Sequence, residues 1–507
     1  MGILIDYDLC EGCGKCVPKC SHHALKMDGD TLVVNNRLCT ECAMCIDFCP
    51  NEAMDLENNV VGDFLIREER DEFVENSEVK RVHINEDNPC IVRLEGCDNC
   101  NGCVRTCKIR VRKEQDPDCQ LCLGCGQCIH TCPEKVLQPK NDMGKVLSAL
   151  QGGKTCIAYT APGTRVALGD EFGEKPGENV ENKLVSALRA MGFRYVLDLN
   201  FAADVTIMEE SSELIRRLKN GGTLPMITSC CPAWVRYCEL FYPDLLDNLS
   251  TCKSPMGMEG ALLNSYFLPA QGLAEDDVFT VAVTPCTAKK GEITRPEITG
   301  TDAVITIQEL GQYLRGNLNY SSLPEGRFDS FMGEGSGAGA IFGNSGGVME
   351  AALRTASHLL SEKELLPESC AALHGMEDFK ELTLEISGTT LRTAVINGMS
   401  NAVPVLDSIR DGSCQYDFIE IMNCSGGCIG GGGQPRLAEE DEFYVKKRRI
   451  DSIYAKDEVA PCRAAHLNPE VQKLYQNYLG APCSEEAHRL LHTVYQDRSM
   501  EVKGLSS

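Results

Sequence analysis

From about residue 150 onward, short apolar runs alternate with segments of helical periodicity. The apolar runs have the composition of short buried strands; they cover residues 155–160, 194–199, 223–228, 279–284 and 416–422. Residues 181–192 have apolar side chains at helical spacing and end at Gly192, a residue type that often terminates helices. Residues 204–222 end at Gly221 with Lys and Arg in the last turns, which suits the helix dipole. The alternation predicts an α/β domain.

The residues before this region are dominated by cysteine. The chain has 30 cysteines in 507 residues, with eight in residues 1–55 and nine in residues 96–133. Its start lacks the basic and apolar stretches of a signal peptide, and no apolar run is long enough to span a membrane. We therefore expect a cytoplasmic protein whose thiols bind metal instead of forming disulfides. Residues 56–95 are mostly acidic and predict a connector between the two cysteine-rich segments.

The first cysteine-rich segment contains the pattern C-x2-C-x2-C-x3-C twice, and the second copy is followed by Pro50. Three closely spaced thiolates bind three irons of a 4Fe–4S cubane, and the fourth cysteine ligates the other cluster. One cluster is expected on Cys10, Cys13, Cys16 and Cys49, and the other on Cys39, Cys42, Cys45 and Cys20. Zinc is the alternative, but zinc sites use C-x2-C pairs and not two crossed runs. The segment resembles bacterial two-cluster ferredoxins.

The second cysteine-rich segment repeats this spacing, which indicates an internal duplication. By the same crossing, one cluster is expected on Cys97, Cys100, Cys103 and Cys132, and the other on Cys122, Cys125, Cys128 and Cys107. Cys119 creates a rival register, and we interpret it as a spare thiol. Cys90 and His83 have no recognisable ligand spacing. Four clusters in tandem predict a path for electrons that ends at a redox site in the remaining domain.

Four of the predicted strands lead directly into unusual loops. The loops are APGTR (161–165), SCCPAW (229–234), PCTAKK (285–290) and NCSGGCIGGGGQP (423–435). In open α/β sheets, ligands bind at the carboxyl ends of the strands. Parallel strands would therefore bring together the cysteines of the last three loops, Cys230, Cys231, Cys286, Cys424 and Cys428. Because Cys424 and Cys428 are four residues apart, they could face the same way on a helical turn.

These cysteine loops are similar to the signature motifs of FeFe hydrogenases, and the resemblance extends from about residue 150 to the C-terminus. The family binds a 4Fe–4S cubane that a cysteine sulfur joins to a two-iron centre with CO, cyanide and a dithiolate amine. The resemblance implies that Cys231, Cys286, Cys424 and Cys428 hold the cubane, with Cys428 as the bridge. It implies that Lys289 hydrogen-bonds a cyanide, that Met422 packs beside the two irons, and that Ala161 and Pro162 contact the cofactor.

The resemblance also implies a proton relay that starts at Cys230, which would exchange protons with the bridging amine instead of binding metal. Glu210, Glu213 and Arg217 are spaced i, i+3 and i+7 on one helix face. A solvated acidic face is the ordinary interpretation of this pattern. The family uses these positions, with a hydroxyl at Ser250, to pass protons to solvent.

The chain departs from the common family motifs at several places around the expected cofactor. Ala233 replaces Gly, Thr284 replaces Met, Met256 replaces Gln and Ser425 replaces Pro. Gly163 replaces a Ser whose hydroxyl would touch a cyanide. The expected ligands are retained while their surroundings change. Because such surrounding groups tune potential and affinity, the resemblance does not settle catalytic bias, rate or oxygen sensitivity. The changes resemble a less-studied branch of the family.

The sequence thus predicts α+β ferredoxin-like modules at 1–55 and 96–145, an acidic connector at 56–95, and an α/β catalytic domain at 146–507. The parallel strands of that domain would converge on the active site. A net charge of −25 disfavours nucleic acid and membrane partners. The expected partners are a ferredoxin-type one-electron carrier, maturation proteins and hydrogen itself, in an anaerobic organism. Two alternatives are a non-enzymatic Fe–S assembly protein on the same fold and a subunit of an electron-bifurcating complex.

Overall fold

The computed structural model describes residues 3–5, 10, 13–20, 25–28, 31–34, 45, 49, 54–56, 82, 84–100, 102–107, 121–437 and 441–503. The chain divides into two compact units, Met1–Asn76 and Ser77–Ser507. Residues 57–81 of the expected connector lie outside the described residues, as do Cys39, Cys42, His83 and Cys119. The expected division of the chain into four parts stays a prediction.

The first unit contains two short strand pairs. Strand β1 (Ile3–Ile5) pairs antiparallel with β4 (Met54–Leu56), and β2 (Leu25–Asp28) pairs antiparallel with β3 (Thr31–Val34). The short 3₁₀ helix η1 (Val17–Lys19) follows Cys16. Cysteines share the small core with apolar side chains; its described buried members are Cys16, Cys45, Leu25, Leu32 and Met54.

The second unit begins with the other cysteine-rich segment. Strand β5 (Ile91–Arg93) pairs antiparallel with β6 (Leu137–Pro139), and the short helices α3 (Gly102–Thr106) and α4 (Gln127–His130) lie between them in sequence. Arg436, from the far end of the chain, donates hydrogen bonds to the carbonyls of Ile129 and Leu137. This segment therefore packs directly on the α/β part.

The α/β part contains two sheets. The first has the order β11-β10-β7-β8, all parallel, with bounds β7 Thr155–Thr160, β8 Tyr195–Asp198, β10 Val278–Thr284 and β11 Ala303–Thr306. The second has the order β12-β13-β14-β9, with bounds β12 Phe379–Ile386, β13 Thr389–Asn397, β14 Phe418–Met422 and β9 Met226–Ile227. In it β12 is antiparallel to β13, and the other pairs are parallel. The predicted strands are present, and they are shared between the two sheets.

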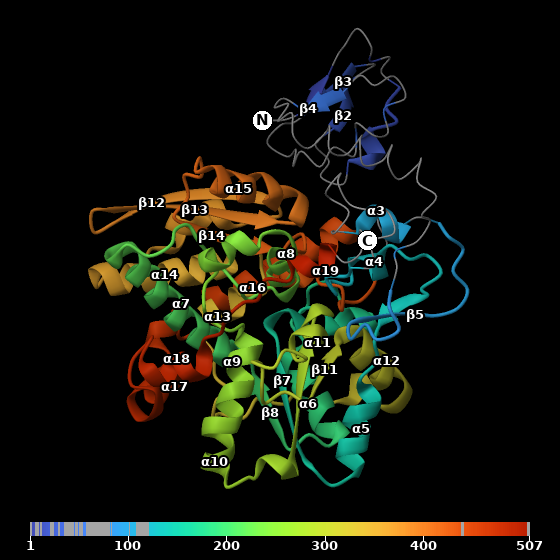
Figure 1. Cartoon of the computed structure of the whole chain (residues 1–507). Coiled ribbons are helices and arrows are strands. Elements are labelled where there is room, and N and C mark those ends of the chain that lie inside the picture. Colours follow the sequence, from blue (N-terminus) through green and yellow to red (C-terminus); the bar gives the residue numbers. More distant parts are fainter. Residues whose placement is uncertain are drawn as a thin grey trace. The chain divides into compact units, whose positions relative to one another are not determined.

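Helices separate and cover the two sheets, and α7, α13 and α14 lie between them (Figure 1). Helix α7 (Asn200–Asn220) packs Phe201 and Val205 against the first sheet and Leu214 against the second. The other described helices are α5 Met143–Gln151, α6 Glu181–Met191, α8 Pro232–Phe241, α9 Pro255–Leu262, α10 Leu268–Gln271, α11 Ala288–Glu292, α12 Ile307–Asn317, α13 Gly337–Ile341, α14 Gly347–Ser361, α15 Met399–Asp411, α16 Glu442–Glu458, α17 Pro469–Leu474, α18 Glu485–Leu491 and α19 Ser499–Lys503.

Both predicted helix ends are confirmed, because α6 ends at Gly192 with φ 109° and α7 at Gly221 with φ 75°. The run 223–228 forms a strand only at Met226–Ile227. Leu224 is exposed, and Pro225 has no N–H to donate, so the ladder starts at Met226. Across the described residues, the structure contains no helix that combines the length and apolarity needed to cross a membrane.

Candidate functional site

The four loops predicted to converge do meet, at the carboxyl ends of β7, β9, β10 and β14. The Ala161 N–H donates to the Val283 carbonyl at 3.0 Å, and Gln434 donates to the Gly163 carbonyl at 3.1 Å. The Gly433 N–H donates to the Pro285 carbonyl at 2.8 Å. Lys289 connects the loop at 285–290 to the loop at 229–234, because its Nζ donates to the Cys230 carbonyl at 3.2 Å.

The cysteines expected to bind the cubane lie close enough to interact electrostatically. The thiol of Cys286 interacts with those of Cys424, Cys428 and Cys231. Burial, followed by repulsion from Cys231, raises the pKa of Cys428 to about 12. Burial likewise raises the pKa of Cys286 and Cys424, which favours their protonated form when no cation is near. Such a donor set fits a metal cluster, since metal ions replace the protons of their thiol ligands.

The adjacent residues Cys230 and Cys231 face different surroundings. Cys231 packs in an apolar cluster with Cys286, Cys125 and Trp234. Cys230 packs in another cluster with Cys428 and Met422. The two thiols therefore contact different groups of side chains, and the division between proton transfer and metal binding stays a prediction.

The expectation of a helical turn between Cys424 and Cys428 is wrong. Gly426 and Gly427 between them have φ values of 78° and 88°, which no α-helix adopts, and Cys428 begins the short 3₁₀ helix η10 (Cys428–Gly430). A Cβ on Gly427 would stand 2.5 Å from the Ser345 nitrogen. Close packing against residues 343–345 therefore dictates glycine in this loop.

The other residues expected beside the cofactor lie on or next to the converging loops. Lys289 is held by Glu292 at 2.6 Å; burial disfavours its charge, but Glu292 and nearby thiols raise the pKa of Lys289 overall. Met422 is 2% exposed at the end of β14. Ala161 and Pro162 are buried where β7 runs into the short helix η3 (Pro162–Thr164).

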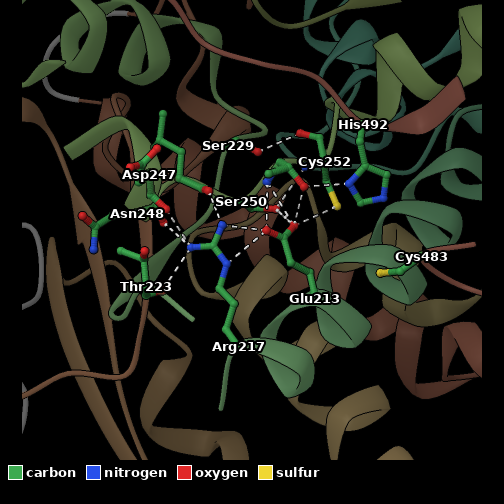
Figure 2. A network of polar contacts seen from close by, with 12 residues as sticks. Glu213, Arg217, Thr223, Ser229, Asp247, Asn248, Ser250, Cys252, Cys483 and His492 are labelled. Atoms are coloured by element: carbon green, nitrogen blue, oxygen red, sulfur yellow. Dashed lines mark hydrogen bonds and ion pairs between the residues drawn. The ribbon is translucent and has the colours of Figure 1, made fainter. Parts of the chain in front are cut away.

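The residues expected to relay protons form a connected set, and Figure 2 shows its outer part, Ser250, Glu213 and Arg217. Glu210 is buried beside Cys230; burial, against a hydrogen bond from Ser250, raises the pKa of Glu210 to about 8. The Ser250 hydroxyl donates to Glu213 at 3.3 Å, and Glu213 accepts from Arg217 at 2.6 Å. One oxygen of Glu210, Oε2, has no hydrogen-bond partner in the described structure. The set runs from the buried thiol to an arginine that bonds the surface carbonyls of Thr223 and Asp247.

The second cysteine-rich segment lies against this site. The thiols of Cys125 and Cys424 interact electrostatically. Gln127 of α4 donates to the Cys424 sulfur at 3.2 Å and to the Gly430 carbonyl at 3.0 Å. Cys128 interacts with Cys122, Cys125 and Cys107, the cysteines predicted to share its cluster, and also with Cys103 of the neighbouring set. The other predicted set in this segment comprises Cys97, Cys100, Cys103 and Cys132. The Arg93 side chain donates a hydrogen bond to the sulfur of Cys97 at 3.2 Å.

In the first unit, the Cys16 thiol interacts with Cys49, Cys13 and Cys10, the cysteines predicted to share its cluster. Cys20 and Cys45 pack in the same core. Cys39 and Cys42, which complete the second predicted set, are not among the described residues.

The chain belongs to the iron-only hydrogenase family. The family model for the C-terminal domain of the hydrogenase large chain matches residues 154–432, and the model for the small chain matches residues 443–498. A 4Fe–4S dicluster domain matches residues 2–50, and a 4Fe–4S binding domain matches residues 120–137. The predicted resemblance to FeFe hydrogenases and the predicted ferredoxin-like character of the N-terminal region are confirmed. The matches support iron–sulfur clusters and an H-cluster.

Individual relatives and structures agree with this family. Iron hydrogenase 1 of Clostridium pasteurianum is 43% identical over 72% of this chain and 65% of its own length, so the chain spans about two thirds of that relative. An FeFe hydrogenase structure from Chlamydomonas reinhardtii is 37% identical with a TM-score of 0.64, over 71% of this chain and 99% of that one. Cytosolic iron-sulfur assembly component 3 of Mus musculus is 29% identical over 85% of this chain and 92% of its own length.

Several residues of the site were not predicted from the sequence. Gln127 lies some 300 positions from its partner Cys424, and Glu292 and Thr251 occupy segments with no motif of their own. Thr251 follows Ser250 directly in the sequence. A second hydroxyl next to an expected relay residue was the one sequence feature that could have pointed to Thr251. Glu209 adjoins Glu210 on α7 in the same way.

Proposed function

We propose that this protein catalyses the reversible oxidation of hydrogen to protons and electrons. The observation that carries the proposal is the polar path from Cys230 through Glu210, Ser250 and Glu213 to Arg217, which begins beside the converging cysteines. A proton-exchanging reaction needs such a path, and an assembly scaffold does not.

The ligand assignment follows the expected family pattern. Cys231, Cys286, Cys424 and Cys428 would hold a 4Fe–4S cubane, with Cys428 bridging to a two-iron centre. When bound, that centre supplies the chemistry that splits or forms hydrogen. Lys289 would hydrogen-bond a cyanide of the centre, and Met422, Ala161 and Pro162 would line its pocket and exclude water.

The proton-carrying residues would act in series. Cys230 would exchange protons with the cofactor and with Glu210. Glu210, whose pKa lies near 8, can take and release a proton close to neutral pH. Ser250 would pass the proton through its hydroxyl to Glu213, and Arg217 would hold Glu213 in position towards solvent.

Electrons would travel through four 4Fe–4S clusters to a ferredoxin-type partner. The cluster next to the active site would use Cys122, Cys125, Cys128 and Cys107, since Cys125 neighbours Cys424 and Gln127 donates to its sulfur. The chain is also 41% identical, over 75% of its length, to the NADP-reducing hydrogenase subunit of Solidesulfovibrio fructosivorans. This similarity supports the alternative that the protein is a subunit of a larger complex.

A non-enzymatic role in iron–sulfur assembly is the second candidate, and the similarity to the mouse assembly component favours it. The experiment measures hydrogen evolution from reduced carrier by the protein after maturation of its two-iron centre. Wild-type protein should be active, and Cys424→Ala should be inactive because it loses a cubane ligand. Cys414→Ala, which removes a half-buried thiol outside the predicted ligand sets, should retain activity. Absence of hydrogen turnover from fully matured wild type would favour the assembly role.

A further inference from the structure

Glu213, the carboxylate near the outer end of the proposed relay, is hydrogen-bonded in two directions. Its Oε1 accepts from Arg217, while its Oε2 accepts from the hydroxyls of Ser250 at 3.3 Å and Thr251 at 3.0 Å. The Thr251 hydroxyl also lies 2.7 Å from Nδ1 of His492 (Figure 2 shows His492 approaching the Glu213 network). Hydrogen bonds therefore branch at Glu213: one path leads to Ser250 and the other leads through Thr251 to His492.

His492 connects the branch to a buried carboxylate. Its Nε2 lies 3.0 Å from Oε2 of Glu209, and the side chains of His492 and Glu209 are 3% and 0% exposed. Glu209 is positioned by two more donors, the Tyr475 hydroxyl at 2.5 Å and the Cys483 N–H at 2.7 Å. A continuous chain of hydrogen bonds thus runs from Glu213 through the half-buried Thr251 and the buried His492 to the buried Glu209.

We propose that Thr251, His492 and Glu209 form a second branch of the proton relay, in which His492 stores a proton and delivers it to Glu213. The inference rests on the proposed hydrogenase function. Histidine is suited to storage because its charge changes between about pH 5 and 8. In this branch the Nε2–H of His492 donates to the Glu209 carboxylate and stays in place. The proton that is exchanged is therefore the one on Nδ1.

The transfer balances without any other reactant. In the loaded state, the His492 Nδ1–H donates to the Thr251 oxygen, and the Thr251 O–H donates to the Glu213 carboxylate. His492 gives its proton to Thr251 as Thr251 gives its own to Glu213. Imidazolium becomes neutral imidazole, carboxylate becomes carboxylic acid, and Thr251 keeps one proton throughout. Its hydroxyl then donates to Nδ1.

Titratable groups from several elements face His492. Helix α7 contributes Glu209 and Glu213, and the segment before α9 contributes Cys252, whose thiol lies 3.8 Å from Glu213. The C-terminal region contributes Tyr475, Cys483 and, on α18, His488. The exposed ring of His488 stacks on that of His492 at 3.9 Å. Arg216 interacts with Cys483 and His488 from the outer side.

The chain contains a matched histidine away from the relay. His466 is buried, its Nδ1 lies 3.3 Å from the Thr355 hydroxyl, and its Nε2 lies 3.0 Å from Glu364. This arrangement of threonine, histidine and glutamate has the same bonding pattern but ends on no relay residue. His466→Asn is therefore the control for His492→Asn, in which the amide can still bond Thr251 but cannot store a proton.

The first test is the pH profile of hydrogen evolution by matured protein. His492→Asn should lower the rate about threefold to tenfold at neutral pH and flatten its rise towards lower pH, because general acid–base groups contribute at least this much. Metal-bound CO and cyanide bands should stay unchanged. Thr251→Val should reproduce the effect, and Thr251→Ser, which keeps the hydroxyl, should lose less of the rate than Thr251→Val. His466→Asn should behave as wild type. Unchanged pH profiles in both His492→Asn and Thr251→Val would overturn the proposal. If His492→Asn does not fold, the profile of Thr251→Val decides.

The second test needs no two-iron centre. In protein that holds only its cubanes, the infrared band of protonated carboxyl groups is followed against pH. If His492 carries the stored proton, its charge and the bond from Thr251 favour the Glu213 carboxylate, so in His492→Asn one carboxyl band should appear at higher pH than in wild type. An identical titration would contradict the branch. If matured wild type evolves no hydrogen, the proposed function fails, and this titration still decides the coupling of His492 to Glu213.

Discussion

Cys230 and Cys231 are neighbours whose thiols lie in different apolar clusters, one with Met422 and Cys428 and the other with Cys286. Burial, and then the charge of Glu210, raises the pKa of Cys230 well above its usual value, so its thiol holds a proton firmly until a stronger base takes it. The spacing of the loops predicted the convergence of these residues. It could not predict the bend at Gly426 and Gly427, which depends on contacts with residues 343–345.

Replacing Cys230 with Ala should remove most hydrogen turnover and leave the metal content and infrared bands nearly unchanged. No other thiol or carboxylate in these loops is placed to take its proton, and Cys230→Asp should recover some turnover because a carboxylate can also carry one. Cys238→Ala removes a buried thiol in α8, outside the site, and should keep its turnover. Near-wild-type hydrogen evolution by Cys230→Ala would mean that Cys230 only packs.

Glu210 makes a prediction about stability against pH. Burial raises its pKa from 4.5 to about 8 in the folded protein. The folded state therefore keeps a proton that the unfolded state loses, and stability declines as pH rises from about 4.5 to about 8. Glu210→Gln removes this decline, so the Tm of the variant relative to wild type should be higher at pH 8 than at pH 5. The exposed substitution Asp276→Asn is the control, and a constant Tm difference for Glu210→Gln would contradict the assigned pKa.

Helix α7 is the element that organises the site, because it crosses between the two sheets and carries Glu209, Glu210, Glu213 and Arg217. Its bounds were largely predictable from periodicity and from Gly221. The assignment of strands to two sheets was not, because a strand's own pattern does not reveal its partners. The position of α4 against the Cys424 loop depends likewise on contacts between distant segments.

Gln127 of α4 offers a test of how the second cluster segment and the active site are joined. An N–H donor to a cysteine sulfur stabilises the more negative, reduced state of a cluster. Gln127→Leu should lower the midpoint potential of the catalytic cubane by about 40 mV, the equivalent of one hydrogen bond of about 1 kcal/mol in a one-electron couple. A redox titration followed by EPR measures this. Gln138→Leu, which removes a donor to the Lys135 carbonyl, should leave the potential unchanged, and equal shifts in both would contradict the assignment.

At the scale of the whole chain, cysteine spacing was the most informative property of the sequence. The family and the ferredoxin-like N-terminal region followed from it, because each ferredoxin-type cluster takes three of its ligands from one short run with fixed spacing. Contacts that tune the clusters, such as Arg93 with Cys97, come from outside the motifs and were not predictable.

The cluster content of the whole molecule follows from the proposed ligand sets. Iron and sulfide analysis should give four ferredoxin-type cubanes and one catalytic cubane in the protein before the two-iron centre is added. EPR of the reduced protein should show interacting clusters. Zinc in place of iron at either cysteine-rich segment would contradict the electron path.

The infrared spectrum of the matured protein tests the proposed function most directly. A two-iron centre that is held by Cys428, with a cyanide hydrogen-bonded by Lys289, should give infrared bands of metal-bound CO and cyanide. These bands should change when hydrogen is added. An assembly protein on the same fold would carry its cubanes without these bands. Matured protein with full iron content and no CO or cyanide bands would contradict the proposal that this chain is a hydrogenase.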